Sequence, residues 1–398
     1  MNKNKEEYTP ATGVLYKGDK VNGMSLTPET IPCFLTTAFT SESLSDIKKV
    51  YETKGYTYVR TRNPNRTALA EVMSYLECGE ASLIFSSGMG AITSTLIALL
   101  EPGDHIICNS NIYGETFSTI SEILRKMSIE TTFVDYNNME EVKKSVKPNT
   151  KLIYSEVLSN PTLQIADLRG LAELAHSNGA LLMVDNTFTT PVSIQPIRFG
   201  ADIVVNSLTK FLNGHSDAIG GSITSTKEIV DKIHPVSMLC GTPGDPFDSW
   251  LILRGIHTAE IRLPQQMKTA EKLAAALEKN KHVSLVNHPS LDSYKQKALA
   301  DSMFGEKGRC AMLSFIVPED IDKIDAFMKK LKFASYAPTL GGIRTTMSHP
   351  VTSSHMTVPD DIRRKMGITP GMIRISVGIE DADDLIKDFE QALTVFDE

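Results

Sequence analysis

The sequence predicts an α/β protein: a mostly parallel sheet of seven strands covered by helices on both faces, followed by a smaller α+β domain. Between residues 81 and 224, short apolar runs alternate with helical patterns of roughly 10–15 residues. The apolar runs are continuous rather than interrupted at every second position, which is typical of strands buried on both faces. Beyond residue 255 the order of the patterns changes, which predicts a second domain.

The elements follow one another regularly after an irregular start. Residues 1–60 hold one helical pattern, at 41–54, which Ser41 or Ser43 could cap. The runs expected to form the large sheet lie at 81–85, 105–108, 129–135, 151–157, 180–185, 201–207 and 218–224. Helical patterns accompany them at 67–79, 91–100, 117–127, 140–146 and 168–179. Ligands of such sheets bind beyond the carboxyl ends of the strands, so we search there for a site.

The last third of the chain begins with a long helical pattern over 250–279, which Pro264 is expected to interrupt. Strand patterns at 309–317 and 373–378 then alternate with helical patterns at 320–331 and 381–396. We therefore divide the chain into an N-terminal arm (1–60), an α/β domain (61–255) and a C-terminal α+β domain (256–398).

The composition excludes several classes of function. The 398 residues include 41 Lys and Arg against 48 Asp and Glu, and the net charge of −7 disfavours a general surface for nucleic acid or anionic membranes. No apolar run approaches the ~20 residues of a membrane span, and the charged start does not resemble a secretory signal. Five scattered cysteines argue against a disulfide scaffold, and no cluster of side chains has metal-ligand spacing. We expect a cytoplasmic protein without a metal.

The most informative residue is Lys210, on a polar turn directly after the apolar run at 201–207. Lysine is seldom fully buried, and an amine in such a place can have a lowered pKa and form a Schiff base. Ser207 and Thr209 flank it with hydroxyls that can hold a phosphate. The alternative for any single lysine is a solvated loop.

Two further turns follow strands in the same way. Asp185 ends the run at 180–185, where an aspartate either pairs with a buried cation or caps a turn. The turn at 86–90 holds Gly88 and Gly90 before a helix, whose free N–H groups can bind a phosphate. A Gly-x-Gly turn is often only a tight turn, and this one lacks the third glycine of the dinucleotide motif. Together, an imine-forming lysine, an acid and a phosphate cradle indicate pyridoxal 5′-phosphate (PLP).

At these positions the sequence resembles the Cys/Met-metabolism family of PLP enzymes, the trans-sulfuration group of fold type I (aspartate aminotransferase-like). The resemblance runs from about residue 25 to the C-terminus, and its most specific motif is SLTKFLNGHSDAIGG at 207–221. The supporting motifs are YVRTRNP (58–64), FSSGMGAI (85–92), NIYGETF (111–117), SEVLSNPTL (155–163), VDNTFTTP (184–191), DPFDSWLILRG (245–255) and RISVGIED (374–381).

The resemblance implies a role for each matching residue. Lys210 would be linked to the cofactor and move protons, and Tyr113 would stack on its ring and act as an acid or base near the leaving group. Asp185 would pair with the ring nitrogen, Asn160 would contact the ring hydroxyl, and Arg374 would bind the substrate α-carboxylate unless it is a surface arginine. The residues that would hold the phosphate are Gly88, Met89, Ser207 and Thr209.

The resemblance also implies a homo-oligomer. Tyr58 and Arg60 would reach the phosphate of the neighbouring subunit, although a plain polar loop is the alternative. A dimer would then be obligatory, and a tetramer is usual in the family.

Three positions that would line the substrate site depart from the family pattern. Arg344 follows a glycine pair where cystathionine γ-lyases and γ-synthases usually have glutamate, and it would suit an anionic or neutral distal group unless it turns to solvent. Glu115 stands where methionine γ-lyases usually have cysteine; it would either bind a substrate ammonium group or favour the start of a helix. Thr339 replaces a frequent serine.

The resemblance predicts a PLP-dependent carbon–sulfur lyase that converts cystathionine or methionine by α,γ-elimination to 2-oxobutyrate, ammonia and a thiol. One alternative is γ-replacement on an O-acylhomoserine, as in sulfhydrylases and cystathionine γ-synthase, which Arg344 favours. A second is β-elimination, as in cystathionine β-lyase. A third, a regulator that binds PLP without catalysis, is disfavoured because Lys210, Asp185, Tyr113 and Arg374 are all present.

Overall fold

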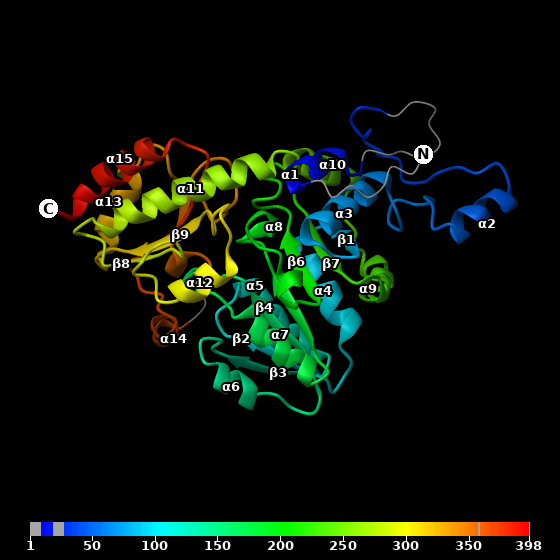
Figure 1. Cartoon of the computed structure of the whole chain (residues 1–398), viewed down its shortest axis with the longest axis horizontal. Coiled ribbons are helices and arrows are strands. Elements are labelled where there is room, and N and C mark those ends of the chain that lie inside the picture. Colours follow the sequence, from blue (N-terminus) through cyan, green and yellow to red (C-terminus); the bar gives the residue numbers. More distant parts are fainter. Residues whose placement is uncertain (1–8, 19–27, 357–358, 398) are drawn as a thin grey trace.

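The computed structural model describes residues 9–18, 28–356 and 359–397, and these contain two sheets (Figure 1). The larger sheet has seven strands in the order β1-β7-β6-β5-β4-β2-β3. The smaller sheet has five strands in the order β10-β11-β12-β9-β8. The predicted fold class, α/β with a smaller α+β part, is confirmed.

The strands of the larger sheet fall on the seven apolar runs. They are β1 (Ala81–Phe85), β2 (His105–Asn109), β3 (Glu130–Val134), β4 (Thr150–Glu156), β5 (Leu181–Asp185), β6 (Ile203–Ser207) and β7 (Gly221–Ser225). Strand β7 pairs antiparallel with both β1 and β6, whereas the other pairs described in this sheet are parallel. The sheet is therefore mostly parallel, with β7 reversed.

The helices around the larger sheet precede, separate or follow its strands. They are α1 (Pro10–Tyr16), α2 (Leu44–Glu52), α3 (Pro64–Glu77), α4 (Gly88–Leu99), α5 (Gly114–Ser118), the π-helix η1 (Thr119–Leu124), α6 (Met139–Lys144), α7 (Leu168–Ser177), α8 (Thr190–Ser193), the 3₁₀-helix η2 (Pro196–Phe199), α9 (Lys227–Cys240) and α10 (Pro246–Ile256). No helix in the described part of the chain is long and apolar enough to cross a membrane.

Both faces of the larger sheet are buried, as the continuous apolar runs predict. Ile106 and Tyr154 belong to one core cluster, which includes residues of α4 and α9. Their chain neighbours Ile107 and Ile153 belong to another, which includes residues of α7 and of the C-terminal part. Successive side chains of a strand point to opposite faces, so a strand that is covered twice needs apolar residues throughout.

The smaller sheet is built from short strands and covered by long helices. Its strands are β8 (Leu285–Asn287), β9 (Met312–Ile316), β10 (Ser335–Tyr336), β11 (Thr346–Ser348) and β12 (Met372–Ser376). The remaining helices are α11 (Ala259–Glu278), α12 (Lys297–Met303), α13 (Ile321–Lys330), η3 (Pro350–Thr352), α14 (Asp360–Lys365), α15 (Ala382–Leu393) and η4 (Thr394–Phe396). Phe315, Phe327 and Phe389 pack ring against ring and join β9, α13 and α15.

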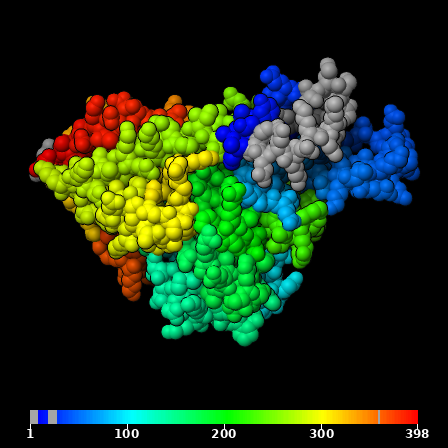
Figure 2. Space-filling view, viewed as in Figure 1, coloured from blue at the N-terminus to red at the C-terminus, as the bar shows by residue number. Residues whose placement is uncertain are grey.

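In the N-terminal arm, helix α1 packs against α3 and α11, whereas the part that carries α2 extends away from the body of the molecule (Figures 1 and 2). Its helix α2 is capped by Ser43, whose side chain accepts the N–H of Asp46. None of the α2 residues is buried, and Leu44 and Tyr51 are 88% and 66% exposed. An amphipathic helix without a buried face lacks the packing that normally stabilises it.

Two expectations about helices are wrong in detail. The pattern over 250–279 is broken at His257–Thr258, between α10 and α11, and Pro264 lies inside α11. Pro264 stands in the second turn of that helix, where a proline removes one hydrogen bond near the start instead of dividing the element. The pattern over 117–127 forms the end of α5 and the π-helix η1 rather than one α-helix.

Candidate active site

Several strands of the larger sheet end at one edge, and the sequence-predicted cofactor residues lie there. Ser207, at the end of β6, is paired with Gly221 of β7, which in turn is paired with Phe85 at the end of β1. Asp185, at the end of β5, is paired with Glu156 at the end of β4. The parallel direction of β4, β5 and β6 therefore gathers polar side chains at one place.

A phosphate-sized cradle lies at the start of α4. A Cβ atom on Gly88 would lie 3.0 Å from the Ser207 Cβ, and one on Gly221 would lie 2.2 Å from the Ser87 carbonyl oxygen. Only glycine allows this close approach of three backbones. Ser87 caps the helix by accepting an N–H of its first turn at 2.9 Å. The other leading N–H groups, those of Gly88 and Met89, have no intrahelical acceptor and form the positive end of the helix dipole.

The hydroxyl residues close this cradle. The Thr209 hydroxyl donates to the Gly220 carbonyl oxygen at 3.2 Å and accepts the Gly220 N–H at 3.1 Å. The Thr209 N–H also donates to the Gly220 carbonyl. The N–H of Ser207 donates to Thr187 Oγ1 at 2.8 Å. The Ser207 hydroxyl has no hydrogen-bond partner among the described residues, so it is free to bind an anion.

Two carboxyl groups lie side by side below this edge. Asp185 Oδ1 accepts the N–H of Thr187 at 2.8 Å. Burial raises the pKa of Asp185, and the hydrogen bonds from Thr187 oppose that shift. Burial and the charge of Asp185 raise the pKa of Glu156 well above its usual value. Such a pair favours a proton, or a cationic ring nitrogen, placed against it.

Lys210 lies in the turn after β6 and is half-buried. Burial, and then the positive charge of Arg374, lower the pKa of its amine. Gly341, at φ +83°, packs on its backbone, because a Cβ there would lie 2.6 Å from the Lys210 carbonyl carbon. The segment 339–342 therefore contacts the turn that carries the amine.

Arg374 lies on β12 and is 5% exposed, which excludes a surface arginine. Its Nη1 donates to Asn160 Oδ1 at 3.0 Å, and its Nη2 to the Thr339 carbonyl at 3.4 Å, whereas Nε has no partner among the described residues. Burial lowers its pKa to about 10. A buried guanidinium that has an unused donor and no carboxylate in the described chain is suited to bind an anion.

Tyr113 lies close to both Glu156 and Arg374. Its N–H donates to Glu156 Oε1 at 2.7 Å, and its side chain is 41% exposed. Burial and then Glu115 raise the pKa of its hydroxyl, and Arg374 opposes them. The phenol is therefore protonated at neutral pH and can donate a proton.

The structure leaves three predicted residues, Arg344, Tyr58 and Arg60, outside this group. Arg344 is exposed, and it has no ion-pair partner within the residues described. Glu115 is also exposed, but it lies close enough to Tyr113 for its charge to raise the pKa of that hydroxyl. Tyr58 is 45% exposed, and Arg60 contacts the Tyr58 ring and donates to the Met238 carbonyl at 3.0 Å.

Sequence reasoning missed Glu156 and Thr187. Glu156 is the last residue of β4, as Asp185 is of β5, but the predicted run extended one residue further, to 157, so the rule that selected Asp185 passed over Glu156. Thr187 carries no comparable signal, because a threonine in a turn is common.

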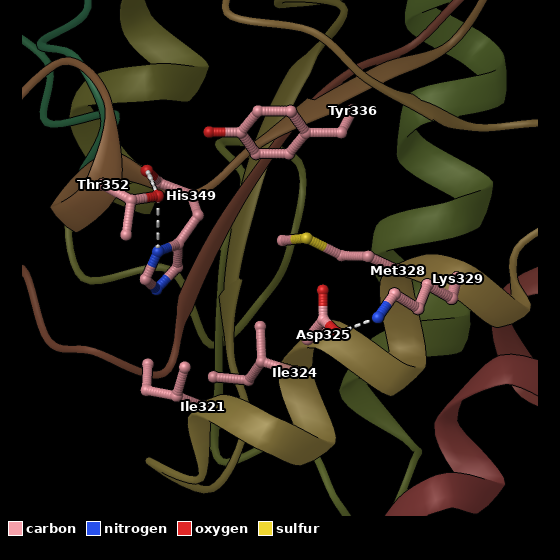
Figure 3. Close-up of a pocket in the computed structure, with 8 residues that line it drawn as sticks. All are labelled: Ile321, Ile324, Asp325, Met328, Lys329, Tyr336, His349 and Thr352. Carbon is pink, nitrogen blue, oxygen red and sulfur yellow. Dashed lines mark hydrogen bonds and ion pairs between the residues drawn. The ribbon is translucent and has the colours of Figure 1, made fainter.

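The cavity drawn in Figure 3 is a different place. Its volume is about 420 Å³, and it lies between α13 and the segment that carries Tyr336 and His349. Ile321, Ile324 and Met328 form an apolar wall on the α13 side. None of the cofactor or substrate residues predicted from the sequence lines it. Within the described residues, no group of three His, Cys, Asp or Glu side chains could hold a metal ion.

Comparisons with known proteins agree with this chemistry. The family model for Cys/Met metabolism PLP-dependent enzymes matches residues 12–394. A cystathionine gamma-lyase of Bacillus subtilis is 43% identical over 340 residues, covering 85% of this chain and 89% of that protein. A cystathionine beta-lyase of the same organism is 40% identical over 345 residues, covering 85% of this chain and 86% of that protein.

A solved structure extends the agreement to the fold. The cystathionine gamma synthase of Xanthomonas oryzae pv. oryzae, in complex with cystathionine, superposes with a TM-score of 0.92 at 32% identity. The match covers 98% of this chain and 99% of the other. The fold type I expectation is confirmed. The chain belongs to the family of Cys/Met metabolism PLP-dependent enzymes, and PLP is its cofactor.

Proposed function

We propose that the protein is a PLP-dependent carbon–sulfur lyase that converts cystathionine or methionine by α,γ-elimination to 2-oxobutyrate, ammonia and a thiol. The observation that carries this proposal is the buried Arg374 with its unused Nε donor, next to the amine of Lys210 and the phenol of Tyr113. An anion receptor beside an amine and an acid suits an amino acid whose α-carbon loses a proton. The 43% identical cystathionine gamma-lyase supports the same reaction.

The residues at the sheet edge fit PLP. The N–H groups of Gly88 and Met89 and the hydroxyls of Ser207 and Thr209 would hold the phosphate. Asp185 would bind the ring nitrogen and Asn160 the ring hydroxyl, and Lys210 would be the attachment point. When bound, the cofactor supplies an electron sink for the substrate α-carbon.

The side chains of this chain would then act in a defined order. Arg374 binds the α-carboxylate through charge-assisted hydrogen bonds and so fixes the α-carbon. Lys210, whose pKa is lowered by burial and by Arg374, is available as a base and removes the α-proton. Tyr113, whose pKa is raised by burial, carries the proton that the departing sulfur needs.

A second candidate function is γ-replacement on an O-acylhomoserine. Arg344 follows the glycine pair Gly341–Gly342, which packs against Lys210, and its guanidinium is exposed without an ion-pair partner in the described chain. An arginine at this place suits an anionic or neutral distal group better than an ammonium group.

The experiment that separates these functions is product analysis with the PLP-loaded protein. Cystathionine, methionine, cysteine and an O-acylhomoserine are offered separately, and products are identified by mass. We expect 2-oxobutyrate from cystathionine or methionine. Pyruvate would assign β-elimination instead, and a thioether formed only from the O-acylhomoserine plus a thiol would assign γ-replacement.

The proposal includes a homodimer in which Tyr58 and Arg60 complete the partner's phosphate site, with two dimers forming a tetramer. The exposed α2 helix and the exposure of Tyr58 support a contact made by this arm. The test mixes two inactive variants, Lys210→Ala and Arg60→Ala, under conditions that allow subunits to exchange. Activity should return, because a hybrid dimer has one complete site; no recovery would contradict the shared site.

The proposal also places the enzyme in the cytoplasm. All five cysteines are unpaired in the structure, which suits a reducing compartment. Fractionation of the source cells with an antibody to the protein would test this location.

A further inference from the structure

Arg262 on α11 binds the turn that carries Lys210. It is 7% exposed, and its guanidinium donates five hydrogen bonds. The acceptors are Thr258 Oγ1 (3.2 Å) and the carbonyl oxygens of Phe211 (3.2 Å), Leu212 (3.1 Å), Asn213 (3.4 Å) and Gly255 (3.0 Å). Three of these carbonyls follow Lys210 directly in the chain. The cation therefore occupies the carbonyl end of that turn, where positive charge is favoured.

Two glycines show how closely this turn fits around the arginine. A Cβ on Gly214, at φ +77°, would lie 2.2 Å from Arg262 Nη1. A Cβ on Gly255 would lie 2.2 Å from the Asn213 carbonyl oxygen. The turn therefore cannot shift by an ångström without breaking several of these hydrogen bonds.

Gln266 lies one helical turn after Arg262 on the same face of α11, and it binds the segments next to Arg374. It is fully buried, and its Nε2 donates to the Gly342 carbonyl at 2.9 Å and to the Val377 carbonyl at 2.8 Å. Val377 directly follows β12, the strand that carries Arg374. Gly342 follows Gly341, whose N–H donates to the Ser376 hydroxyl at 2.8 Å.

We infer that Arg262 and Gln266 are positioning residues that hold the turn of Lys210 and the strand of Arg374 at a fixed separation. The inference rests on the proposed roles of Lys210 and Arg374. One turn of α11 binds both segments, and Leu263 and Met267 on that turn are buried in the core. A substrate whose carboxylate is bound by Arg374 then already has its α-carbon oriented toward the Lys210 amine. A misplacement of about 1 Å at such a pair costs on the order of 100-fold in rate.

The test compares three variants of the PLP-loaded protein. Arg262→Lys keeps the charge but cannot reach four carbonyls, and Gln266→Leu keeps the approximate volume but cannot donate. Phe389→Leu is the control, because it loosens the aromatic packing among β9, α13 and α15 and removes no hydrogen bond to either segment. The readouts are the pH midpoint of the visible cofactor band, the Kd for L-norleucine, which has no leaving group, and the melting temperature.

We expect Arg262→Lys to move the pH midpoint and lower kcat about tenfold, and Gln266→Leu to weaken norleucine binding about tenfold with little change in the midpoint. The double variant should lose less kcat/KM than the product of the two single losses. Either change alone already allows the distance between the Lys210 turn and the Arg374 strand to vary. Phe389→Leu should lower only the melting temperature.

The inference is overturned if both α11 variants lose melting temperature alone, as the control does. If Arg262→Lys does not fold, Gln266→Leu and its norleucine Kd still decide. Failure of the proposed function looks different: the wild-type protein itself would then show no visible band, or a band that survives in Lys210→Ala.

Discussion

Arg374 and Arg262 are two buried arginines in the C-terminal half of the chain that differ in what their donors do. They are 5% and 7% exposed, and burial lowers the pKa of each to about 10. Neither has a carboxylate partner within the described residues. Arg262 donates five hydrogen bonds to protein oxygens, whereas Arg374 donates two and leaves Nε unused.

The difference teaches how to separate a structural cation from a receptor. A buried charge is costly unless its hydrogen-bonding capacity is filled. Each of the three guanidinium nitrogens of Arg262 donates to a protein oxygen, so its charge is solvated by the protein itself. The hydrogen bonds of Arg374 are complete only when an anion binds. The neighbouring Lys210 and Tyr113 then provide a base and an acid next to that anion.

The largest effect is expected from removing the Lys210 amine, which Arg262 positions and next to which Arg374 binds the substrate. Lys210→Ala should lower turnover at least about 10³-fold, because the amine proposed to take the α-proton is lost. The exposed Lys227→Ala, which loses an ion pair with Asp231, is the matched control and should keep wild-type turnover. Turnover is measured as α-keto acid release. Full activity in Lys210→Ala would remove the basis of the comparison.

The next effect tests the receptor side directly. Arg374→Leu should lower kcat/KM about 100-fold by removing charge-assisted hydrogen bonds to the carboxylate, with the visible cofactor band retained. Arg364→Leu removes an exposed arginine paired with Glu319 and Asp360 and should leave kcat/KM unchanged. An unchanged kcat/KM in Arg374→Leu would mean that its unused donor binds no substrate.

A smaller effect concerns the distal part of the substrate. If Arg344 selects the distal group, Arg344→Glu should raise the ratio of kcat/KM for cystathionine to that for an O-acylhomoserine, on the order of tenfold. Arg344→Ala separates loss of the arginine from gain of the acid. Equal ratios in all three proteins would show that this side chain faces solvent.

The smallest effect is expected at Glu77, a buried acid that can be compared with the two buried arginines. Glu77 is fully buried, and its Oε1 accepts hydrogen bonds from Asn186 (2.9 Å) and Asn206 (2.6 Å), next to Asp185 and Ser207 in the chain. Burial raises its pKa to about 7, from 4.5. A raised native pKa gives stability that is complete below the unfolded value and declines as the pH rises through the native value.

Glu77→Gln should remove this dependence. The melting temperature of the wild type relative to the variant should fall by about 2 °C between about pH 5 and about pH 8. Thermal unfolding followed by circular dichroism gives both values. A constant difference across this range would show that Glu77 does not titrate there.

The fold was largely predictable from the sequence, and the reason is physical. Strands covered on both faces need continuous apolar residues, so all seven strands of the larger sheet left a clear pattern. The short strands β8, β10 and β11 have two or three residues each and left none. Helix α9 contains Pro235, which weakened its helical pattern.

The site was predictable where the chemistry depends on residue type and chain position. Lys210 and Gly88 each follow a strand and Asp185 ends one, so the topology brings them to one edge. The burial of Arg374 was not predictable, because a surface arginine on a strand gives the same local pattern. Arg262 and Gln266 were also missed, since their function depends on contacts 49–111 residues away in the chain.

The most direct test of this account fixes the cofactor to the lysine that holds it. The PLP-loaded protein is reduced with borohydride, digested, and its peptides are mapped by mass spectrometry. We predict one labelled peptide, with the pyridoxyl group on Lys210, and loss of the label in Lys210→Ala. A label on another lysine, or spread over several exposed lysines, would contradict the account.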